Sequence, residues 1–335
     1  VETLDLAGIP VLAADRAEED PIVCGGGPSV YNPEPVAPLY DAIMVGDGEE
    51  SIVEVASCIR SCRALGRSRS ETLEALASIP GVYVPLLYEV LYDASGRSHL
   101  RPKEGSKAAA RVVKRVVSDF KATDPVTTTL VPYPQMVHDR LAVEVLRGCA
   151  RGCRFCQAGM TYRPVRERPA DQIVSAVMCG LRQTGYDEVS LTSLSTTDHS
   201  NLETVLRRLN ADLSGTGISV SLPSERLDSF GIELARLVAG EKKGGLTFAP
   251  EAGTQRMRDV INKGVTEEDL MHAVEASFSE GWLRMKLYFM IGLPLETDED
   301  VVGIAQMCGR ALELAKRCVP PAKRCAVRIS TSVAV

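Results

Sequence analysis

The sequence predicts an α/β protein in which part of a doubly wound domain precedes a parallel barrel, or part of one. The chain has 335 residues, more than one typical domain, and 45% of them are hydrophobic, enough for a full core. Residues 21–62 alternate strand, loop, strand and helix, as in a doubly wound domain. From residue 139 onward, six strand-like segments alternate with five helical segments, which favours parallel strands joined by right-handed crossovers.

The overall composition disfavours several classes of protein. A formal net charge of -6 argues against a basic surface that follows nucleic-acid phosphates, so RNA is only a weakly supported partner. No apolar run reaches the roughly 18 residues that span a bilayer, and the first residues are not a basic-then-apolar signal. We therefore expect a cytoplasmic protein with no membrane partner. The ten cysteines are expected to be reduced thiols, some of them ligands.

The pattern divides the chain into three regions. Residues 1–65 are expected to be the end of an α/β domain, residues 66–138 a linker with a hairpin around the ASG of residues 94–96, and residues 139–335 the barrel-like core. The first residue is Val1, inside a helix-like pattern, and the last residues lie inside a strand-like segment. We expect the chain to be a piece of a longer protein.

The first region contains a glycine run after its first strand. The strand PIVCGGG ends in Gly25, Gly26 and Gly27. Glycines at this place let a ligand or a helix approach the backbone closely, and a tight turn without a ligand is an equal alternative. DAIMVGDGEE is predicted to be a second strand and turn, and SIVEVASCIRSC a helix. Cys58 and Cys62 on that helix are assigned no chemistry.

The core region reads as strands and amphipathic helices in alternation. Its strands are LAVEVL, DEVSLTSLS, GISVSLPS, GLTFAP, LRMKLYFMIGLP and AVRISTSVAV. The apolar faces of the first two helices are Ile173, Val174, Val177, Met178 and Leu181, then Leu202, Val205, Leu206, Leu209 and Leu213. Helices are predicted to end near Gly185 and Gly240, and Thr266 with Asp269 resembles a capping box. In such a fold the functional residues lie at the carboxyl ends of the strands.

Three cysteines follow the first of these strands, in RGCARGCRFCQAG. Cys149, Cys153 and Cys156 would form one stripe on a continuous helix, but the glycines and arginines between them disfavour a buried helix. A structural zinc site normally has four ligands, and the sequence offers no second cysteine pair, while His199 and His272 are isolated. Three thiolates at these spacings fit a 4Fe-4S cluster in which one iron has no protein ligand.

The CxxxCxxC pattern of CARGCRFC, with Phe155 before the last cysteine, resembles the radical S-adenosylmethionine (SAM) superfamily from residue 141 to the end of the chain. The resemblance implies a partial (β/α)6 radical SAM barrel, with Phe155 near the adenine of SAM. It also implies that SAM binds the open iron, and that an electron from the cluster cleaves SAM to methionine and a 5′-deoxyadenosyl radical. The radical would abstract hydrogen from an unidentified substrate, and a flavodoxin or ferredoxin would donate the electron.

The resemblance implies further SAM contacts. Thr192 and Ser193 stand where the family has a GGE motif that contacts the SAM amino group, although the glutamate and glycines of that motif are absent here. In APEAGTQRMR, Glu251 would accept hydrogen bonds from the ribose hydroxyls and Arg256 would pair with the carboxylate. Gly292 in YFMIGLPLET would let the backbone approach the adenine.

Four more arginines have two interpretations each. Arg226, after the third strand, would contact substrate or SAM, or would be a solvated loop residue. Arg163, Arg166 and Arg168 would offset negative charge on the cluster and substrate, or would simply face solvent.

The first region resembles part of the cobalamin-type domain found in some radical SAM proteins. The segments that carry this resemblance are GGGPSVYNPEP and DAIMVGDGEE. Residues 1–65 are therefore interpreted as the C-terminal part of a Rossmann-like cobalamin-binding-type domain. In cobalamin-binding members an Asp-x-His-x-x-Gly motif supplies the axial histidine, and none of the four histidines here lies in such a motif. Either residues upstream supply it or the protein binds no cobalamin.

The leading functional hypothesis is thus a radical SAM enzyme that modifies its substrate, for example by methylation or sulfur insertion. The alternative is a non-catalytic iron-sulfur or zinc-binding module used in sensing or assembly.

Overall fold

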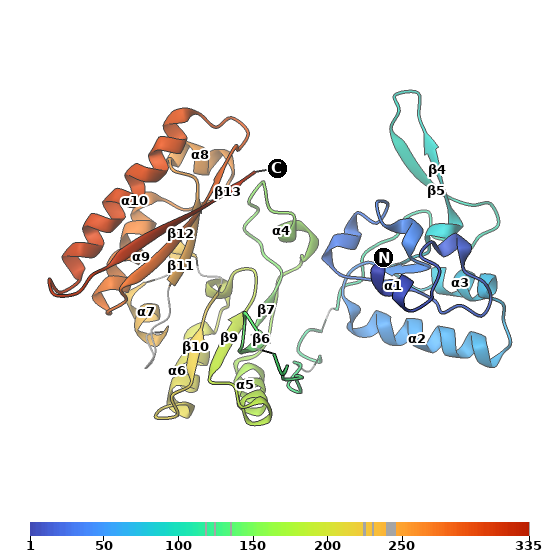
Figure 1. Ribbon diagram of the computed structural model, residues 1–335, viewed down its shortest axis with the longest axis horizontal. Helices are drawn as coiled ribbons and strands as arrows, with labels where there is room; N and C mark the ends of the chain where they lie inside the picture. Colours follow the sequence, from blue (N-terminus) through green and yellow to red (C-terminus); the bar gives the residue numbers. More distant parts are fainter. Residues whose placement is uncertain are drawn as a thin grey trace. The chain divides into compact units, whose positions relative to one another are not determined.

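The computed structural model describes residues 1–117, 119–123, 125–134, 136–223, 226–229, 231–238 and 246–334. The chain separates into two compact units, Val1–Asp119 and Phe120–Val335 (Figure 1). The division falls inside residues 66–138, the segment that the sequence assigns to a linker. No helix in the described ranges combines the length and apolar character needed to cross a bilayer.

The first unit is built on a three-stranded sheet. Strands β1 (Cys24–Gly25), β2 (Ala42–Met44) and β3 (Val82–Tyr83) lie in this order, with β1 parallel and β3 antiparallel to β2. Helices α2 (Gly48–Ala64) and α3 (Arg69–Ala77) contact β2. The buried core between them consists of Ala42, Val55, Leu73, Leu76, Ala77, Val82 and Val84. The strand, loop, strand, helix order predicted for residues 21–62 is confirmed.

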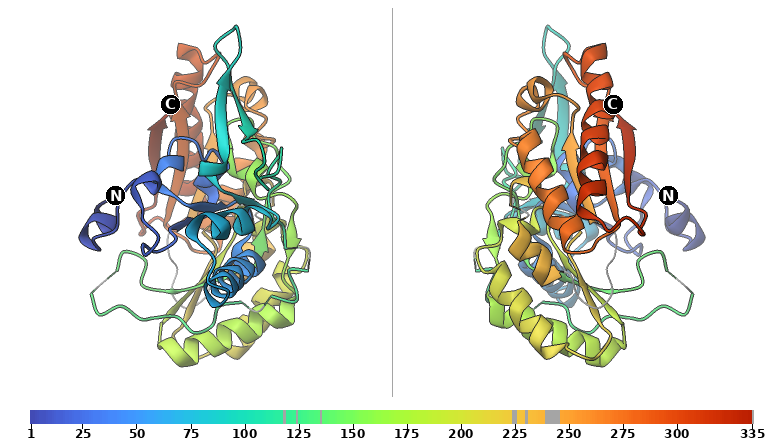
Figure 2. Two further views of the ribbon diagram at one scale, coloured as in Figure 1. Left: turned by 90° about the vertical axis from the view of Figure 1, so that its right-hand side faces the viewer. Right: turned by 90° about the vertical axis from the view of Figure 1, so that its left-hand side faces the viewer.

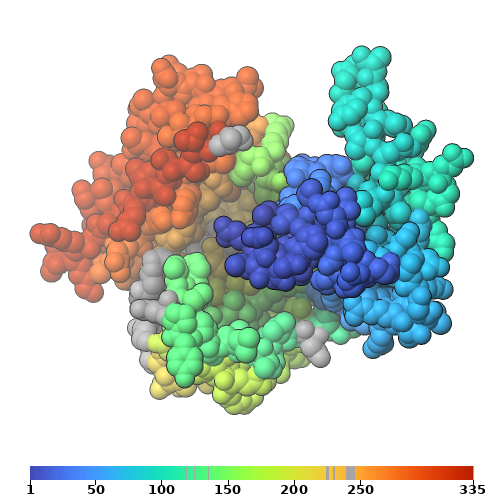
Figure 3. Space-filling model, turned by 45° about the vertical axis from the view of Figure 1, so that its right-hand side comes forward, coloured from blue at the N-terminus to red at the C-terminus, as the bar shows by residue number. Residues whose placement is uncertain are grey.

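A hairpin extends from this unit. β4 (Tyr88–Tyr92) and β5 (Ser98–Pro102) pair antiparallel around residues 94–96, which confirms the predicted hairpin, and Figure 3 shows it projecting from the first unit. The unit begins with the short helix α1 (Glu2–Leu6). Single 3-10 turns in the two units are η1 (Ala13–Asp15), η2 (Pro28–Tyr31), η3 (Ala37–Leu39), η4 (Pro85–Leu87), η5 (Thr196–Asp198) and η6 (Leu227–Ser229).

The second unit contains the six strands predicted for the core region. They form two parallel sheets of three strands, ordered β10-β9-β6 and β11-β12-β13. Their bounds are β6 (Leu141–Glu144), β9 (Glu188–Thr192), β10 (Ser219–Ser221), β11 (Leu246–Glu251), β12 (Arg284–Ile291) and β13 (Ala326–Val333). The alternation of strands and helices is confirmed, and the arrangement of the two sheets as one partial barrel stays a prediction.

Seven helices are described in this unit. They are α4 (Ala158–Thr161), α5 (Ala170–Thr184), α6 (Leu202–Asp212), α7 (Ile232–Val238), α8 (Gln255–Val260), α9 (Glu267–Ser279) and α10 (Asp298–Cys318). The predicted apolar faces of α5 and α6 join the core, with Met178 only partly buried. Figure 2 shows α9 and α10 beside the second sheet, whose Met285, Leu287 and Phe289 are buried in the same core.

The predicted helix ends are largely confirmed. Gly185 closes α5 with a φ of 72°, a conformation that glycine adopts without steric cost. Thr266 and Asp269 form the predicted capping box of α9. The end predicted at Gly240 lies outside the described residues.

Candidate functional site

The three cysteines lie on a loop and not on a helix, as predicted. The loop runs from β7 (Leu146–Arg147) to α4, and β7 pairs with β8 (Arg166–Glu167) to close the segment that contains it. Gly148 begins the loop with a φ of 91°, and a Cβ there would lie 2.7 Å from the carbonyl oxygens of Tyr162 and Pro164. Glycine is therefore required at the start of the loop.

The segment after α8 holds the cysteine loop from the other side. The backbone NH of Arg154 donates to the carbonyl of Ile261 at 2.9 Å. The side-chain amide of Asn262 donates to the carbonyl of Gly152 at 2.9 Å. Asn262 itself has a φ of 53°, a left-handed conformation that asparagine tolerates better than most residues. The sequence does not predict this contact. The Asn-Lys-Gly of residues 262–264 indicates a turn, but it does not show that the turn lies against the cysteine loop.

Replacing Asn262 by alanine is expected to lower the free energy of unfolding by about 2 kcal/mol. The variant loses one hydrogen bond, and alanine lacks the short polar side chain that lets asparagine tolerate the left-handed region, each effect costing roughly 1 kcal/mol. Asn262→Gly is the matched control, because it loses the bond but not the backbone freedom, and it should cost about half as much. Urea denaturation measures both, and an alanine variant as stable as the wild type would contradict the assignment.

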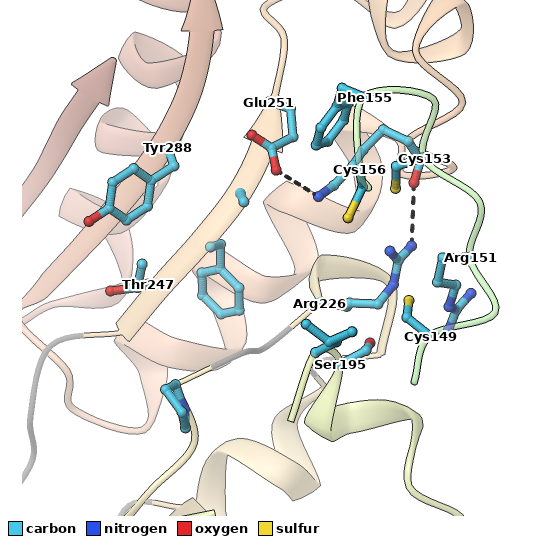
Figure 4. Close-up of a pocket in the computed structure, with 15 residues that line it drawn as sticks. Cys149, Arg151, Cys153, Phe155, Cys156, Ser195, Arg226, Thr247, Glu251 and Tyr288 are labelled. Atoms are coloured by element: carbon cyan, nitrogen blue, oxygen red, sulfur yellow. Dashed lines mark hydrogen bonds and ion pairs between the residues drawn. The ribbon is translucent and has the colours of Figure 1, made fainter. Parts of the chain in front are cut away.

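The cysteine loop forms one side of a cavity of about 310 Å³. Figure 4 shows the three cysteines on one side and Thr247 and Tyr288 on the opposite side. The lining residues are Cys149, Arg151, Cys153, Phe155, Cys156, Leu194, Ser195, Pro223, Arg226, Thr247, Phe248, Ala249, Glu251, Lys263 and Tyr288. The structure thus brings six of the sequence-predicted site residues together: the three cysteines, Phe155, Arg226 and Glu251.

The charged side chains of this cavity are paired. Lys263 contacts the Glu251 carboxylate at 3.0 Å, and Arg226 contacts Asp228 at 2.9 Å. Burial raises the pKa of the Cys153 thiol, while the positive charges of Lys263 and Arg226 act in the opposite direction. Cations beside a cysteine favour its thiolate form, which is the form that binds metal.

Arg151, on the cysteine loop, contacts two aspartates from later segments of the chain. Its Nε donates to Asp198 at 2.9 Å, and Nη1 lies 3.3 Å from Asp228. Burial would raise the pKa of Asp198, but the hydrogen bonds it accepts from Arg151 and Ser195 outweigh burial and lower it. Asp198 is therefore ionised at neutral pH and neutralises Arg151.

Glu251 occupies an unusual backbone position at the end of β11. Its φ is 71°, and the pairing of β11 with β12 shifts register between Phe248 and Glu251. A non-glycine residue in this region costs of order 1–3 kcal/mol, and such residues cluster at functional sites. The register shift directs the Glu251 side chain to the cavity, where it is 15% exposed.

The other predicted SAM contacts do not line this cavity. Arg256 forms an ion pair with Asp300 and donates to the carbonyl of Leu295 at 3.0 Å. The Ser193 hydroxyl lies 2.8 Å from that of Thr196. Thr192 ends β9 and Gly292 follows β12, and the cavity lining includes Ser195 instead.

The arginines after the loop have separate positions. Arg163 donates to the carbonyl of Cys149 at 3.4 Å. Arg147, Arg166 and Arg168 surround the ring of buried Phe120, with guanidinium carbons 4.8, 5.9 and 4.0 Å from its centroid. Cation–π contacts of this kind stabilise local packing. Arg166 and Arg168 therefore pack on Phe120, and neither of them lines the cysteine cavity.

The donor set suits a cluster better than a single ion. In the described part of the chain, no three His, Cys, Asp or Glu side chains are grouped closely enough to hold one metal ion. In an iron-sulfur cubane the thiolates bind separate irons. Three thiols around one cavity, with three cationic side chains in its lining, fit such a cluster.

Two family models match the chain. The model described as radical SAM proteins, N-terminal, matches residues 1–85, and the radical SAM superfamily model matches residues 143–308. The second range includes the whole cysteine loop and Glu251.

Curated relatives match over much of the chain. An uncharacterized protein of Methanocaldococcus jannaschii is 29% identical over 84% of this chain and 54% of its own length. An uncharacterized methyltransferase of Pyrococcus horikoshii is 22% identical over 86% of this chain and 58% of its own length. A tRNA-2-methylthio-N(6)-dimethylallyladenosine synthase of Chlorobium phaeobacteroides is 24% identical over 51% of this chain and 36% of its own length. The chain spans about half the length of the first two relatives.

Solved structures share the fold. The radical SAM methyltransferase TsrM from Kitasatospora setae, with cobalamin and a 4Fe-4S cluster bound, has a TM-score of 0.59 and 17% identity, covering 92% of this chain and 55% of that chain. The cobalamin-dependent SAM radical enzyme OxsB, with aqua-cobalamin bound, has a TM-score of 0.58 and 15% identity, covering 86% of this chain and 39% of that chain. These matches confirm a fold of mixed α and β content shared with such enzymes.

Proposed function

The chain belongs to the radical SAM superfamily, and on this premise we propose that it is an enzyme that holds a 4Fe-4S cluster through Cys149, Cys153 and Cys156 and cleaves SAM reductively. When bound and reduced, the cluster supplies the electron that splits SAM into methionine and a 5′-deoxyadenosyl radical, which takes hydrogen from the substrate. The observation that carries the proposal is the single cavity in which the three thiols, Phe155 and Glu251 meet (Figure 4).

The residues around the cavity bind and orient the nucleotide. Phe155 offers an aromatic face for the adenine. The Glu251 carboxylate has free lone pairs beyond its contact with Lys263 and accepts hydrogen bonds from ribose hydroxyls. Arg226, 10% exposed and in the lining, is the cation proposed to face the SAM carboxylate, since Arg256 is held by Asp300. The two sheets place these groups on a rigid frame.

Anaerobic reconstitution tests the proposal. We expect about four irons per chain, and deoxyadenosine released from SAM in the presence of dithionite. A colourless protein that binds one zinc would instead support the non-catalytic alternative.

Replacing Glu251 by glutamine is expected to weaken SAM binding about tenfold while leaving the iron content unchanged. The substitution removes the charge that strengthens the ribose hydrogen bonds, and a tenfold change in affinity is the scale of one charge-assisted bond. Glu268 is exposed in the first turn of α9, and Glu268→Gln is the matched control. Equilibrium dialysis with labelled SAM measures both, and equal affinities would remove Glu251 from the site.

The finer architecture belongs to the same proposal. The sheets β10-β9-β6 and β11-β12-β13 would be the halves of a partial (β/α)6 barrel within residues 139–335, and residues 1–65 would be the end of a Rossmann-like domain. Residues 66–138 would be the connection between them, although their α3 and β3 pack in the first unit. We assign no cobalamin ligand to the first unit, because its one histidine, His99, is exposed on β5 and lies 3.3 Å from Asp93. The names of the relatives support methyl or methylthio transfer as the outcome, with a flavodoxin or ferredoxin as reductant.

A further inference from the structure

A second cavity of the same unit is lined by three cations. It has a volume of about 310 Å³ and lies where the strands of the second sheet begin. Its lining residues are Leu246, Thr247, Arg284, Met285, Lys286, Ala326 and Arg328. A concentration of positive charge is notable in a chain whose formal net charge is -6.

The strand register places the cations on one face of the sheet. Lys286 on β12 pairs with Arg328 on β13, and Arg284 precedes Lys286 by two residues. Residues two apart on a strand point to the same face. Met285 between them is buried on the other face, against the helices. Like charges at paired positions repel and destabilise a sheet, so this arrangement costs stability unless an anion offsets it.

No carboxylate of the described chain neutralises this group. Within the described ranges, Arg284, Lys286 and Arg328 form no ion pair, and no Asp or Glu lines their cavity. The cysteine cavity differs, because Arg151, Arg226 and Lys263 there each have an acidic partner. The three unpaired cations are therefore available to a ligand, and Arg284 and Arg328 are exposed to solvent.

Two residues connect this group to the cysteine cavity. Thr247 lines both cavities. The Lys286 ammonium donates to the Tyr288 hydroxyl at 2.7 Å and lies 4.5 Å from the centre of the Tyr288 ring, which lines the cysteine cavity. Figure 4 shows Tyr288 and Thr247 on the side of that cavity opposite the cysteines. A molecule bound at the cations can therefore extend past Thr247 and Tyr288 toward the cysteine loop.

We propose that Arg284, Lys286 and Arg328 bind the carboxylate or phosphate group of a small substrate and so orient the rest of it toward the cysteine cavity. The inference rests on the proposed function for the substrate role, but anion binding itself does not. Guanidinium groups bind carboxylate and phosphate oxygens with two parallel hydrogen bonds, and the lysine adds a third donor. The cations thus define a class of substrate, small anions, that neither the cysteines nor the SAM contacts specify.

Calorimetric titration of the reconstituted protein with inorganic phosphate and, separately, with succinate tests the proposal at fixed ionic strength. We expect saturable binding of at least one of the two, and the tighter one identifies the anionic group. Arg328→Gln and Arg284→Gln should each weaken binding about tenfold, the scale of one lost charge-assisted contact. Two separate variants guard against misfolding in either one, and thermal unfolding of both is measured alongside.

Arg317→Gln is the matched control, since Arg317 is exposed in the last turn of α10 and outside the cavity. Its affinity for the anion should equal that of the wild type. Absence of saturable binding by both anions, or equal losses in the Arg317 and Arg328 variants, would overturn the proposal. SAM cleavage by the wild-type protein is a separate readout: anion binding without cleavage refutes the proposed function alone, and cleavage without anion binding refutes this inference alone.

Discussion

Replacing Cys149, Cys153 or Cys156 by alanine should abolish cluster assembly and SAM cleavage in each single variant. All three thiols line the same cavity, and a cubane with only two protein thiolates loses one of its three anchors and leaves two irons without a protein ligand. Iron content and the broad visible absorption after anaerobic reconstitution measure the effect. We expect fewer than about one iron per chain in each variant, a loss of most of the metal.

Two other cysteines of the same unit provide the controls. Cys179 lies on α5 and Cys308 on α10, away from the cavity lining. Burial raises the pKa of the Cys308 thiol to about 11, so it is protonated at neutral pH and is not a ligand. Cys179→Ala and Cys308→Ala should retain the full iron content. Iron lost in these two variants, or kept in a variant of the loop cysteines, would contradict the assignment of ligands.

Replacing Gly253 by alanine should lower the free energy of unfolding by about 3 kcal/mol or more. A Cβ at this position would overlap backbone atoms of Asp300, Gly303 and Ile304 in α10. Backbone cannot move aside as a side chain can, and overpacking a rigid core costs about 1–3 kcal/mol, occasionally more. Gly253 follows Glu251 by two residues, so the displacement should also weaken SAM binding.

Gly309, six residues after Gly303 on α10, is the matched control. A Cβ at Gly309 would meet no atom within 4 Å, and alanine in a helix interior is more stable than glycine by roughly 0.5–1 kcal/mol. Gly309→Ala should therefore be neutral or slightly stabilising. Chemical denaturation of both variants measures the difference. A Gly253 variant as stable as the Gly309 variant would show that the close approach of α10 is not required.

Much of the second unit could be predicted because its signals are local. The apolar period of α5 and α6 and the Thr266 cap appear within a few residues of sequence, and each was confirmed. The pairing of β7 with β8 was not predicted, because strands of two residues give no periodicity. The close approach of Gly253 to α10 joins residues about 50 positions apart, so only the folded chain reveals it.

Spacing alone predicts only the part of the candidate site whose residues are neighbours in the sequence. The cysteines and Phe155 are neighbours in the chain, so their spacing was enough to place them together. The resemblance implies a SAM contact for Arg256, and the structure pairs Arg256 with Asp300, a buried carboxylate of the α10 capping box. Burial would raise the pKa of Asp300, yet the hydrogen bonds it accepts hold it well below the usual range. A buried charge of this kind needs a cation, and the sequence does not show which one supplies it.

The cationic cavity was missed for a related reason. Its lysine and arginines lie on two strands whose sequences are mainly apolar. Lys286 and Arg328 are far apart in the sequence, and only the register of β12 with β13 places them side by side. Parallel pairing depends on the intervening helix and turns, so the juxtaposition follows from the fold alone.

Mössbauer spectroscopy of the protein reconstituted with 57Fe, before and after addition of SAM, tests the central claim most directly. Three cysteine ligands leave one iron of four open, so about a quarter of the iron signal should shift when SAM binds while the rest stays unchanged. A cluster whose spectrum ignores SAM, or iron that never forms a 4Fe-4S cluster, would contradict the account.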